Sequence, residues 1–190
     1  MKSDVFENEL NYIKDNNIKE SLKTMINLLP DYFFEVAASS TGKYHPEFSQ
    51  GKGGLVRHTK VAIRIAYELF QDESINNFTD REKDLIIFSL LVHDGLKHGM
   101  IHNEYTQFNH PLLISNYIKE NKDKLLLSES DINFICSCLE KHMGPWTKDY
   151  QGNEVLQKPT SKYERFVHMC DYLSSKKFLN VNFENDKISI

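Results

Sequence analysis

The sequence predicts an all-α domain of six or seven helices that ends in a small β-hairpin. Two observations favour this class: most apolar residues recur at helical spacing between polar loops, and strict alternation appears only near the C-terminus. The chain has 190 residues, of which 40% are hydrophobic and 26% charged, as in globular proteins. This length allows one domain with a sizeable core and is too short for two ordinary ones, so we expect a single domain over residues 1–190.

The chain begins with a helix predicted over residues 4–29. Its apolar residues follow mostly helical spacing, with a break expected at Asn16 and Asn17, and Pro30 ends it. Asp31 is then expected to cap a short aromatic helix, because an aspartate oxygen can accept the backbone N–H groups of a first turn.

A loop and a longer helix follow. Residues 39–54 are rich in glycine, serine and lysine and predict a loop. The next helix starts near Leu55 and carries Arg57 and His58 in its first turn. Its apolar positions recur at helical spacing, so one face of this helix is expected to be buried.

Residues 85–99 begin as an apolar helix that is expected to lie in the core. Thr79 or Asp80 is predicted to cap this helix, which delivers His93 and Asp94 side by side at its end. An imidazole and a carboxylate at the end of an apolar helix need partners that offset their desolvation. A divalent metal is a partner that both can bind, and a helix that simply reaches the surface at His93 is the alternative.

The second half predicts three more helices and the hairpin. After a polar loop, a helix starts at His110, and Ser128 begins another, which is expected to end at His142. A third loop leads to the last helix, which carries Asp171 in an apolar stretch. Residues 178–190 alternate as strands do, with turn residues between, and predict the hairpin.

Charge and composition argue against several classes of protein. The net charge is −4, so the whole surface does not indicate nucleic-acid binding. Residues 1–17 lack the apolar core of a signal peptide, and no stretch approaches the roughly 18 apolar residues of a membrane span. An odd number of cysteines argues against a disulfide framework, so we expect reduced, buried thiols in a cytoplasmic protein. They are Cys136, Cys138 and Cys170.

Five predicted helices each bring a residue of a metal-binding type to an end or to an apolar face. Singly, each has another explanation: a surface or loop histidine, a cation favoured at a helix C-terminus, or an ion-paired acid. Helical bundles build metal sites from side chains on facing helices, and the joint occurrence favours such a site. The residues are His58, His93, Asp94, His110, His142 and Asp171.

These motifs resemble the HD-domain superfamily of metal-dependent phosphohydrolases. They are GGLVRHT at residues 53–59, the HD pair within VHDGLKHG at residues 92–99, His110, His142, and the aspartate that ends PTSKYERFVHMCD. They cover the chain from about residue 53 to about residue 175. The resemblance implies an HD-domain-like helical bundle, and it is closest to HD hydrolases with a GGLxxHT first motif, which include 3′–5′ exoribonucleases.

The resemblance also implies a set of metal ligands. In dinuclear members of the family, the residue that matches Asp94 bridges to a second ion. Mixed nitrogen and oxygen ligands suit Mn, Fe, Co, Ni or Zn. The first ion would be held by His58, His93, Asp94 and Asp171, and a second by His110 and His142 together with Asp94.

One position departs from the dinuclear pattern. His142 and Met143 stand where dinuclear relatives often carry a pair of histidines, so the second ion has one ligand fewer and one or two ions are expected. His98 and His102 sit in polar sequence and are expected to be solvated. His168, on the last helix, is expected to be a satisfied core histidine or to hold a ligand in place.

Catalytic roles are expected of Asp94 and Lys97. Lys97 follows Asp94 by three residues and matches a family lysine that contacts the substrate phosphate. Metal ions activate water and neutralise phosphoryl oxygens, so hydrolysis then needs mostly positioning and positive charge. The loop residues expected to reach the substrate are Lys43, His45, Arg57, Trp146 and Lys158. Trp146 could stack a base or close the core under its loop.

The expected function is a metal-dependent phosphohydrolase that acts on a nucleotide or a related phosphate ester with metal-activated water. A phosphodiesterase or 3′–5′ nuclease for single-stranded oligonucleotides is an alternative, favoured by the GGLVRHT motif and disfavoured by the net negative charge. A non-catalytic module that binds a nucleotide is the third hypothesis, and the intact set of His58, His93, Asp94 and Asp171 argues against it. No membrane partner is expected.

Overall fold

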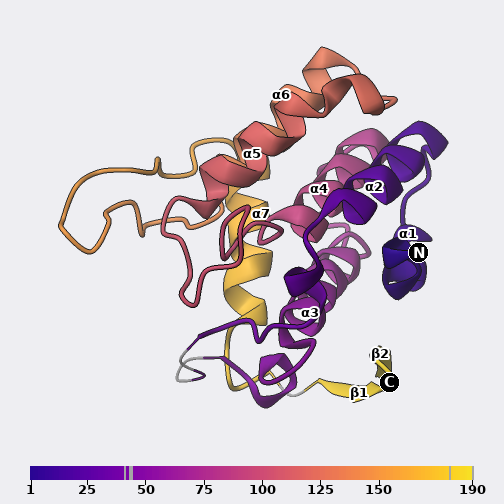
Figure 1. Cartoon of the computed structure of the whole chain (residues 1–190). Helices are drawn as coiled ribbons and strands as arrows, with labels where there is room; N and C mark the ends of the chain where they lie inside the picture. Colours follow the sequence, from indigo (N-terminus) through magenta and orange to yellow (C-terminus); the bar gives the residue numbers. More distant parts are fainter. Residues whose placement is uncertain (41, 43–44, 180, 190) are drawn as a thin grey trace.

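The computed structural model describes the whole chain except residues 41, 43, 44, 180 and 190. The described residues form seven α-helices, four short 3₁₀ helices and one two-stranded antiparallel hairpin (Figure 1). This confirms the predicted all-α class with a C-terminal hairpin. Among the described residues, no helix is both long and apolar enough to cross a bilayer.

The N-terminal segment is broken earlier than predicted. It consists of the 3₁₀ helix η1 (Lys2–Phe6) and the helices α1 (Glu7–Leu10) and α2 (Asn16–Leu28). The expected break at Asn16 and Asn17 is wrong, because Asp15 caps α2 by accepting the N–H groups of Asn17 and Ile18. The buried carboxylate of Asp84 accepts the N–H groups of Lys14 and Asp15 and so stabilises the non-helical segment between α1 and α2.

The aromatic segment after Pro30 is a single 3₁₀ turn, η2 (Asp31–Phe34). The cap position belongs to Pro30, and Asp31 lies within the turn, where its carboxylate pairs with Lys2 Nζ at 2.6 Å. The prediction that Asp31 caps this element is therefore wrong. The buried ring of Phe33 anchors the turn to the core.

Helix α3 (Gly54–Leu69) follows a loop that contains the 3₁₀ helix η3 (Glu47–Ser49). Gly53 has a φ of +71°, a left-handed conformation that glycine adopts without strain. A Cβ atom on Gly54 would lie 2.2 Å from the backbone oxygen of Ser49. The two glycines therefore let the loop pass against the start of α3, which carries His58.

Helix α4 (Asp80–Val92) lies in the middle of the bundle and contacts α2, α3, α6 and α7 (Figure 1). Thr79 caps it: its hydroxyl accepts the N–H of Glu82, and the Glu82 carboxylate accepts the N–H of Thr79, as one of the two predicted caps requires. Every residue from Asp84 to Val92 is buried. A helix that is apolar on all sides must be surrounded, so its end at His93 lies inside the protein.

The remaining helices are α5 (His110–Glu120), α6 (Glu129–Glu140) and α7 (Lys162–Ser174), with the 3₁₀ turn η4 (Lys122–Lys124) between α5 and α6. The predicted capping box at Ser128 and Asp131 is present. Helix α6 ends at Glu140, two residues before the expected end, so that His142 lies in the turn beyond it. Helices α5 and α6 pack against each other, and α7 packs along α3.

The hairpin consists of β1 (Asn182–Glu184) and β2 (Lys187–Ser189), within the predicted 178–190. Asn185 and Asp186 form its turn, both with positive φ, as a two-residue hairpin loop requires. The three cysteines are free and buried, as predicted. One connected cluster of buried apolar residues draws on helices α2 to α7.

Candidate metal centre

Six side chains from separate elements converge at one buried place. Helix α3 contributes His58, the end of α4 contributes His93 and Asp94, and α5 begins with His110. The turn after α6 contributes His142 and helix α7 contributes Asp171. All are buried except Asp171, which is half-buried. The six residues fall into two groups of three, each with one ligand atom per residue within 4.8 Å of the others.

The first group is made of His58, His93 and Asp171. The Oδ1 atom of Asp171 lies 3.0 Å from His58 Nε2 and 3.4 Å from His93 Nε2. Two imidazole nitrogens therefore face the same carboxylate oxygen from opposite helices.

The second group is made of Asp94, His110 and His142. Asp94 Oδ1 lies 3.1 Å from His110 Nε2 and 3.8 Å from His142 Nε2. The two Nε2 atoms are themselves only 3.1 Å apart.

Asp94 connects the two groups, because its second oxygen faces the first one. Asp94 Oδ2 lies 3.5 Å from His93 Nε2 and 3.8 Å from His58 Nε2. One carboxylate thus presents one oxygen to each group, which is the arrangement of a bridging ligand between two neighbouring cation positions.

The other ring nitrogen of each histidine is already used. His93 Nδ1 lies 2.7 Å from the carbonyl oxygen of Leu90, and His110 and His142 make the same contact with the carbonyls of Gln107 and Leu139. A carbonyl oxygen only accepts hydrogen bonds, so Nδ1 carries the hydrogen and Nε2 of a neutral ring presents a lone pair.

His58 reaches the same state through a serine. The hydroxyl of Ser174 donates to the backbone oxygen of Asp171 at 2.7 Å, and His58 Nδ1 lies 3.1 Å from that hydroxyl. Since the serine proton is used, His58 Nδ1 donates to it and His58 Nε2 is also free to act as a ligand.

This arrangement fits a bound cation. The buried Nε2 of His93 has no hydrogen-bond partner among the described residues, and the Nε2 atoms of His110 and His142 lie 3.1 Å apart, so two neutral rings would turn their lone pairs toward each other. Acceptors that face acceptors repel unless a positive charge lies between them, and a divalent metal supplies it for imidazole and carboxylate ligands alike.

The electrostatics of the site agree with this reasoning. Burial lowers the pKa of His93, but the charges of Asp94 and Asp171 outweigh burial and raise it to about 10. A positive charge is therefore favoured at His93 Nε2. Burial, with the neighbouring charges of His93 and His110, lowers the pKa of His142 to about 3 and keeps that ring neutral. A cation beside His93 would therefore be stabilised by the two carboxylates, and the neutral ring of His142 can offer a lone pair to a cation.

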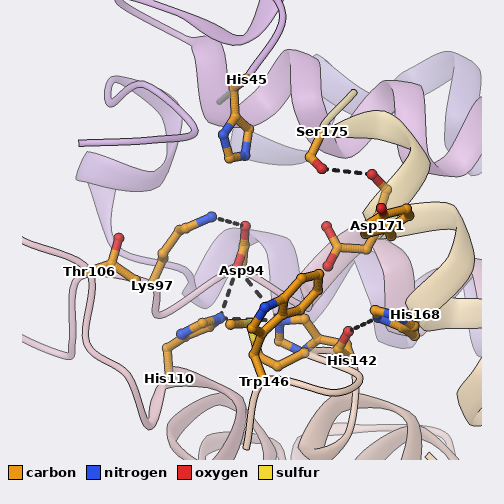
Figure 2. Close-up of a pocket in the computed structure, with 12 residues that line it drawn as sticks. His45, Asp94, Lys97, Thr106, His110, His142, Trp146, His168, Asp171 and Ser175 are labelled. Atoms are coloured by element: carbon orange, nitrogen blue, oxygen red, sulfur yellow. Dashed lines mark hydrogen bonds and ion pairs between the residues drawn. The ribbon is translucent and has the colours of Figure 1, made fainter. Parts of the chain in front are cut away.

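A cavity of about 180 Å³ opens onto this cluster (Figure 2). Lys97 borders it, and its Nζ lies 2.6 Å from Asp94 Oδ2. Burial raises the pKa of Asp94, but Lys97 and His93 outweigh burial and hold it well below the usual range. The carboxylate therefore stays ionised. The other lining residues, beyond Asp94, His110, His142 and Asp171, are His45, Thr106, Met143, Trp146, His168, Tyr172 and Ser175.

The predicted loop residues have different outcomes. His45 lines the cavity with its ring 5.5 Å from that of His58, and burial first, then the His58 charge, lowers its pKa to about 4. Lys158 is exposed and is not among the residues that line the cavity. Lys43 lies outside the described residues.

Arg57 supports a loop rather than the cavity. Its guanidinium donates to the carbonyl oxygens of Phe48, Gln50 and Lys52, and it pairs with Asp186 of the hairpin turn at 3.2 Å. It is not among the residues that line the cavity. The geometry therefore does not favour the predicted contact of Arg57 with substrate, because the guanidinium donors are bonded to the loop.

Trp146 does not close the core, which was one of its two predicted roles. Its side chain is 51% exposed, lines the cavity and stacks on Tyr172 with ring centroids 5.9 Å apart.

The prediction that His98 is solvated is wrong. His98 is only 4% exposed, and its Nδ1 contacts the carbonyl oxygen of Asn103, but it does not belong to either group of ligands.

His168 holds a ligand in place, one of the two roles predicted for it. Its Nδ1 lies 2.7 Å from the backbone oxygen of His142 (Figure 2). Gly144 has a φ of +65°, and a Cβ atom there would lie 2.2 Å from the His168 ring. The glycine therefore lets this turn close against α7.

Sequence reasoning did not identify Thr106, Tyr172, Ser174 and Ser175 as part of the site. Ser174 follows Asp171 by one helical turn, so its position next to a ligand could have been inferred from spacing. Thr106 lies in a loop, and nothing in the local sequence marks it.

In comparisons with known proteins, no family model matches the chain, and no curated protein or solved structure matches it.

Proposed function

We propose that this protein is a metal-dependent phosphohydrolase that acts on a nucleotide or a related phosphate ester. The observation that carries the proposal is the convergence of four histidine Nε2 atoms on two carboxylates beside a cavity that also contains Lys97. Imidazole and carboxylate ligands suit divalent transition ions, and a lysine supplies a positive charge for a phosphate group. The order of the motifs along the chain, which resembles HD-domain hydrolases, supports the same class of reaction.

The ligand set has room for two ions. His58, His93 and Asp171 would hold one, His110 and His142 the other, and Asp94 would contribute an oxygen to each. Divalent ions in such sites lower the pKa of a coordinated water toward neutrality and neutralise negative charge on phosphoryl oxygens. Mn, Fe, Co, Ni and Zn all accept this mixture of nitrogen and oxygen ligands.

The residues of the chain orient the reaction. Lys97 Nζ borders the cavity next to Asp94, so it can pair with a phosphate oxygen that enters there. His45 stays neutral, and its buried Nδ1 has no hydrogen-bond partner among the described residues, so it can bond to an ester or phosphate oxygen. The carbonyl contacts of the ligand histidines fix the rings in advance, which limits reorganisation during the reaction.

Purified protein supplied with Mn²⁺, Fe²⁺, Co²⁺, Ni²⁺ or Zn²⁺ should release phosphate from members of a nucleotide and sugar phosphate panel. Asp94→Ala should abolish this release and the retention of metal, because Asp94 belongs to both groups of ligands. Lys158→Ala is a matched control, since that side chain is exposed and outside the cavity. Full activity in Asp94→Ala would refute the mechanism.

Two further measurements on the same metal-loaded protein distinguish the proposal from the two alternatives. A phosphodiesterase or 3′–5′ nuclease would shorten a labelled single-stranded oligonucleotide, with a rate that falls steeply as salt rises. A binding module would hold metal and nucleotide without turnover. The complete set of ligands favours the enzyme, because binding alone does not need six converging side chains.

We also propose the cytoplasm as the place where the protein works. Its three cysteines are free and buried. Reduced thiols are the rule in that compartment.

A further inference from the structure

The cavity beside Asp94 is small. Its volume of about 180 Å³ is below the range of about 300–1,000 Å³ found for cavities that enclose drug-sized ligands. Lys97 is the only lysine or arginine among the described residues that line it. Each further phosphate of a polyphosphate would bring another negative charge that needs a cation, and the described lining offers no lysine or arginine beyond Lys97.

Trp146 and Tyr172 form a shelf of aromatic rings on the wall of this cavity. Their rings are nearly parallel, with an angle of 24° between the planes, and they come from two different elements, the loop after α6 and helix α7. Lys176 Nζ lies 3.6 Å from the Tyr172 ring centroid, and the His168 ring packs edge-on against Trp146. The indole is therefore supported from α7 while half of its surface is exposed.

A supported tryptophan with an exposed surface at the wall of a small cavity is a place where a planar ring can stack. Burying Trp146 in this way would offset the cost of leaving about half of a large apolar side chain in water. Thr106 and Ser175 line the same cavity on opposite sides of it, and the Ser175 hydroxyl, which donates to the backbone oxygen of Tyr172, can still accept a hydrogen bond from a ligand.

We propose that the substrate is a phosphate monoester with a single phosphate group and a leaving group that carries a planar ring, such as a nucleoside monophosphate. The phosphate pairs with Lys97 beside Asp94, and the ring stacks on Trp146. In the reaction the P–O bond to the leaving group breaks, water supplies the new oxygen on phosphorus, and a proton goes to the departing oxygen. The products are inorganic phosphate and the free alcohol. This inference rests on the proposed function for its chemistry, but not for its binding geometry.

Turnover provides the first test. The metal-loaded enzyme should hydrolyse AMP with a higher kcat/KM than ADP, ATP or ribose 5-phosphate. Trp146→Ala should lower the ratio of kcat/KM for AMP over ribose 5-phosphate about tenfold, within the factor of roughly 5 to 150 that stacking of one base is worth. Tyr150→Ala, in the same loop but exposed and outside the cavity lining, is the matched control and should keep the ratio. Faster turnover of ATP than of AMP, or an unchanged ratio in Trp146→Ala, would overturn the inference while leaving the hydrolase intact.

Binding provides the second test, which needs no turnover. Trp146 is the only tryptophan of the chain, so its fluorescence reports on the shelf alone. Adenosine and AMP should quench it in a saturable way, AMP at lower concentration than adenosine, and ribose 5-phosphate should quench it little. If the fluorescence responds in this way but no substrate is turned over, the proposed function is wrong and the ring site stands. If phosphate esters are turned over but adenosine and AMP leave the fluorescence unchanged, the ring site is wrong and the proposed function stands.

Discussion

Two buried carboxylates of this protein, Glu164 and Asp94, lie in opposite kinds of surroundings. Glu164 accepts hydrogen bonds from Lys141 and Ser137 through one oxygen, and from the N–H groups of Thr160 and Ser161 through the other. Every contact is a donor that meets an acceptor. Asp94 is paired with Lys97 and otherwise faces histidine Nε2 atoms, which carry a hydrogen only when the ring is protonated.

The difference separates an acid whose partners all lie within the chain from one whose surroundings fit a bound cation. A buried polar group costs free energy unless it is paired, and Glu164 is fully paired within the chain. The neutral rings around Asp94 lack donors for it, so this cluster is balanced by positive charge, from Lys97, from a proton on His93 or from a metal ion. Both acids are buried and charged, so burial and charge do not distinguish them. What distinguishes them is whether each acceptor meets a donor within the chain.

Replacing Asp94 and Glu164 in turn by the corresponding amide should give the largest difference in activity and metal content between the two sites. The same pair of variants tests whether the comparison of the two acids is correct. Asp94→Asn should lower kcat/KM on the order of 10³-fold or more and reduce bound metal, because one of the two carboxylate oxygens is replaced by an NH₂ group, which cannot bind a metal. Glu164→Gln should keep metal and activity. Metal content by mass spectrometry and phosphate release measure both. Equal loss of metal in the two variants would show that pairing does not distinguish the sites.

Removal of metal should have the next largest effect. A metal held at a hundred times its dissociation constant stabilises the fold by about 2.7 kcal/mol. For a chain of 190 residues this corresponds to a fall in Tm of about 5–10 °C when a chelator is added. The shift should be much smaller in Asp94→Asn and unchanged in Glu164→Gln. A wild-type Tm that a chelator does not move would argue against a folded-state metal.

Glu164 should contribute to stability rather than to function. Burial would raise its pKa, but the hydrogen bonds from Lys141, Ser137 and the backbone outweigh burial and hold it below the usual 4.5. Glu164→Gln should therefore cost about 1–3 kcal/mol at neutral pH, since donors are left facing an amide. Chemical denaturation of the two proteins measures this difference.

The pH dependence of that difference follows from the lowered pKa. As the pH falls, the unfolded state takes up the proton first, so the contribution of Glu164 is fully present above about pH 4.5 and is lost below it, toward the folded pKa. The gap between wild type and Glu164→Gln should narrow over this interval. A gap that stays constant with pH would contradict the assignment.

The smallest effects should come from two basic residues that the sequence placed near the substrate. Lys158→Ala should change kcat/KM by less than about twofold, because the side chain is solvated. Arg57→Ala should lower Tm by a few degrees through the loss of its loop carbonyl contacts, with a smaller effect on KM than Lys97→Ala. A large KM effect in Lys158→Ala would show that its loop moves over the cavity.

Much of the fold followed from local rules. The capping boxes at Thr79 and Ser128 and the start of α5 at His110 agree with the sequence because a cap joins residues three positions apart. The break after α1 did not follow, because it depends on the carboxylate of Asp84, 70 residues beyond Lys14. The contacts of Arg57 did not follow either, since its partners lie in a loop that folds back onto α3 and in the hairpin turn.

By itself, the sequence determined the all-α class, the caps at Thr79 and Ser128, the hairpin and the identity of the six ligand candidates, since periodicity and adjacency are properties of neighbouring residues. Tertiary structure decided that Asp94 divides its oxygens between two groups, that His98 stays outside them, and that Trp146 lies on the cavity. These outcomes depend on how helices far apart in the chain pack and turn relative to one another. A shift of a few ångströms in that packing changes which lone pairs meet, and no local pattern encodes it.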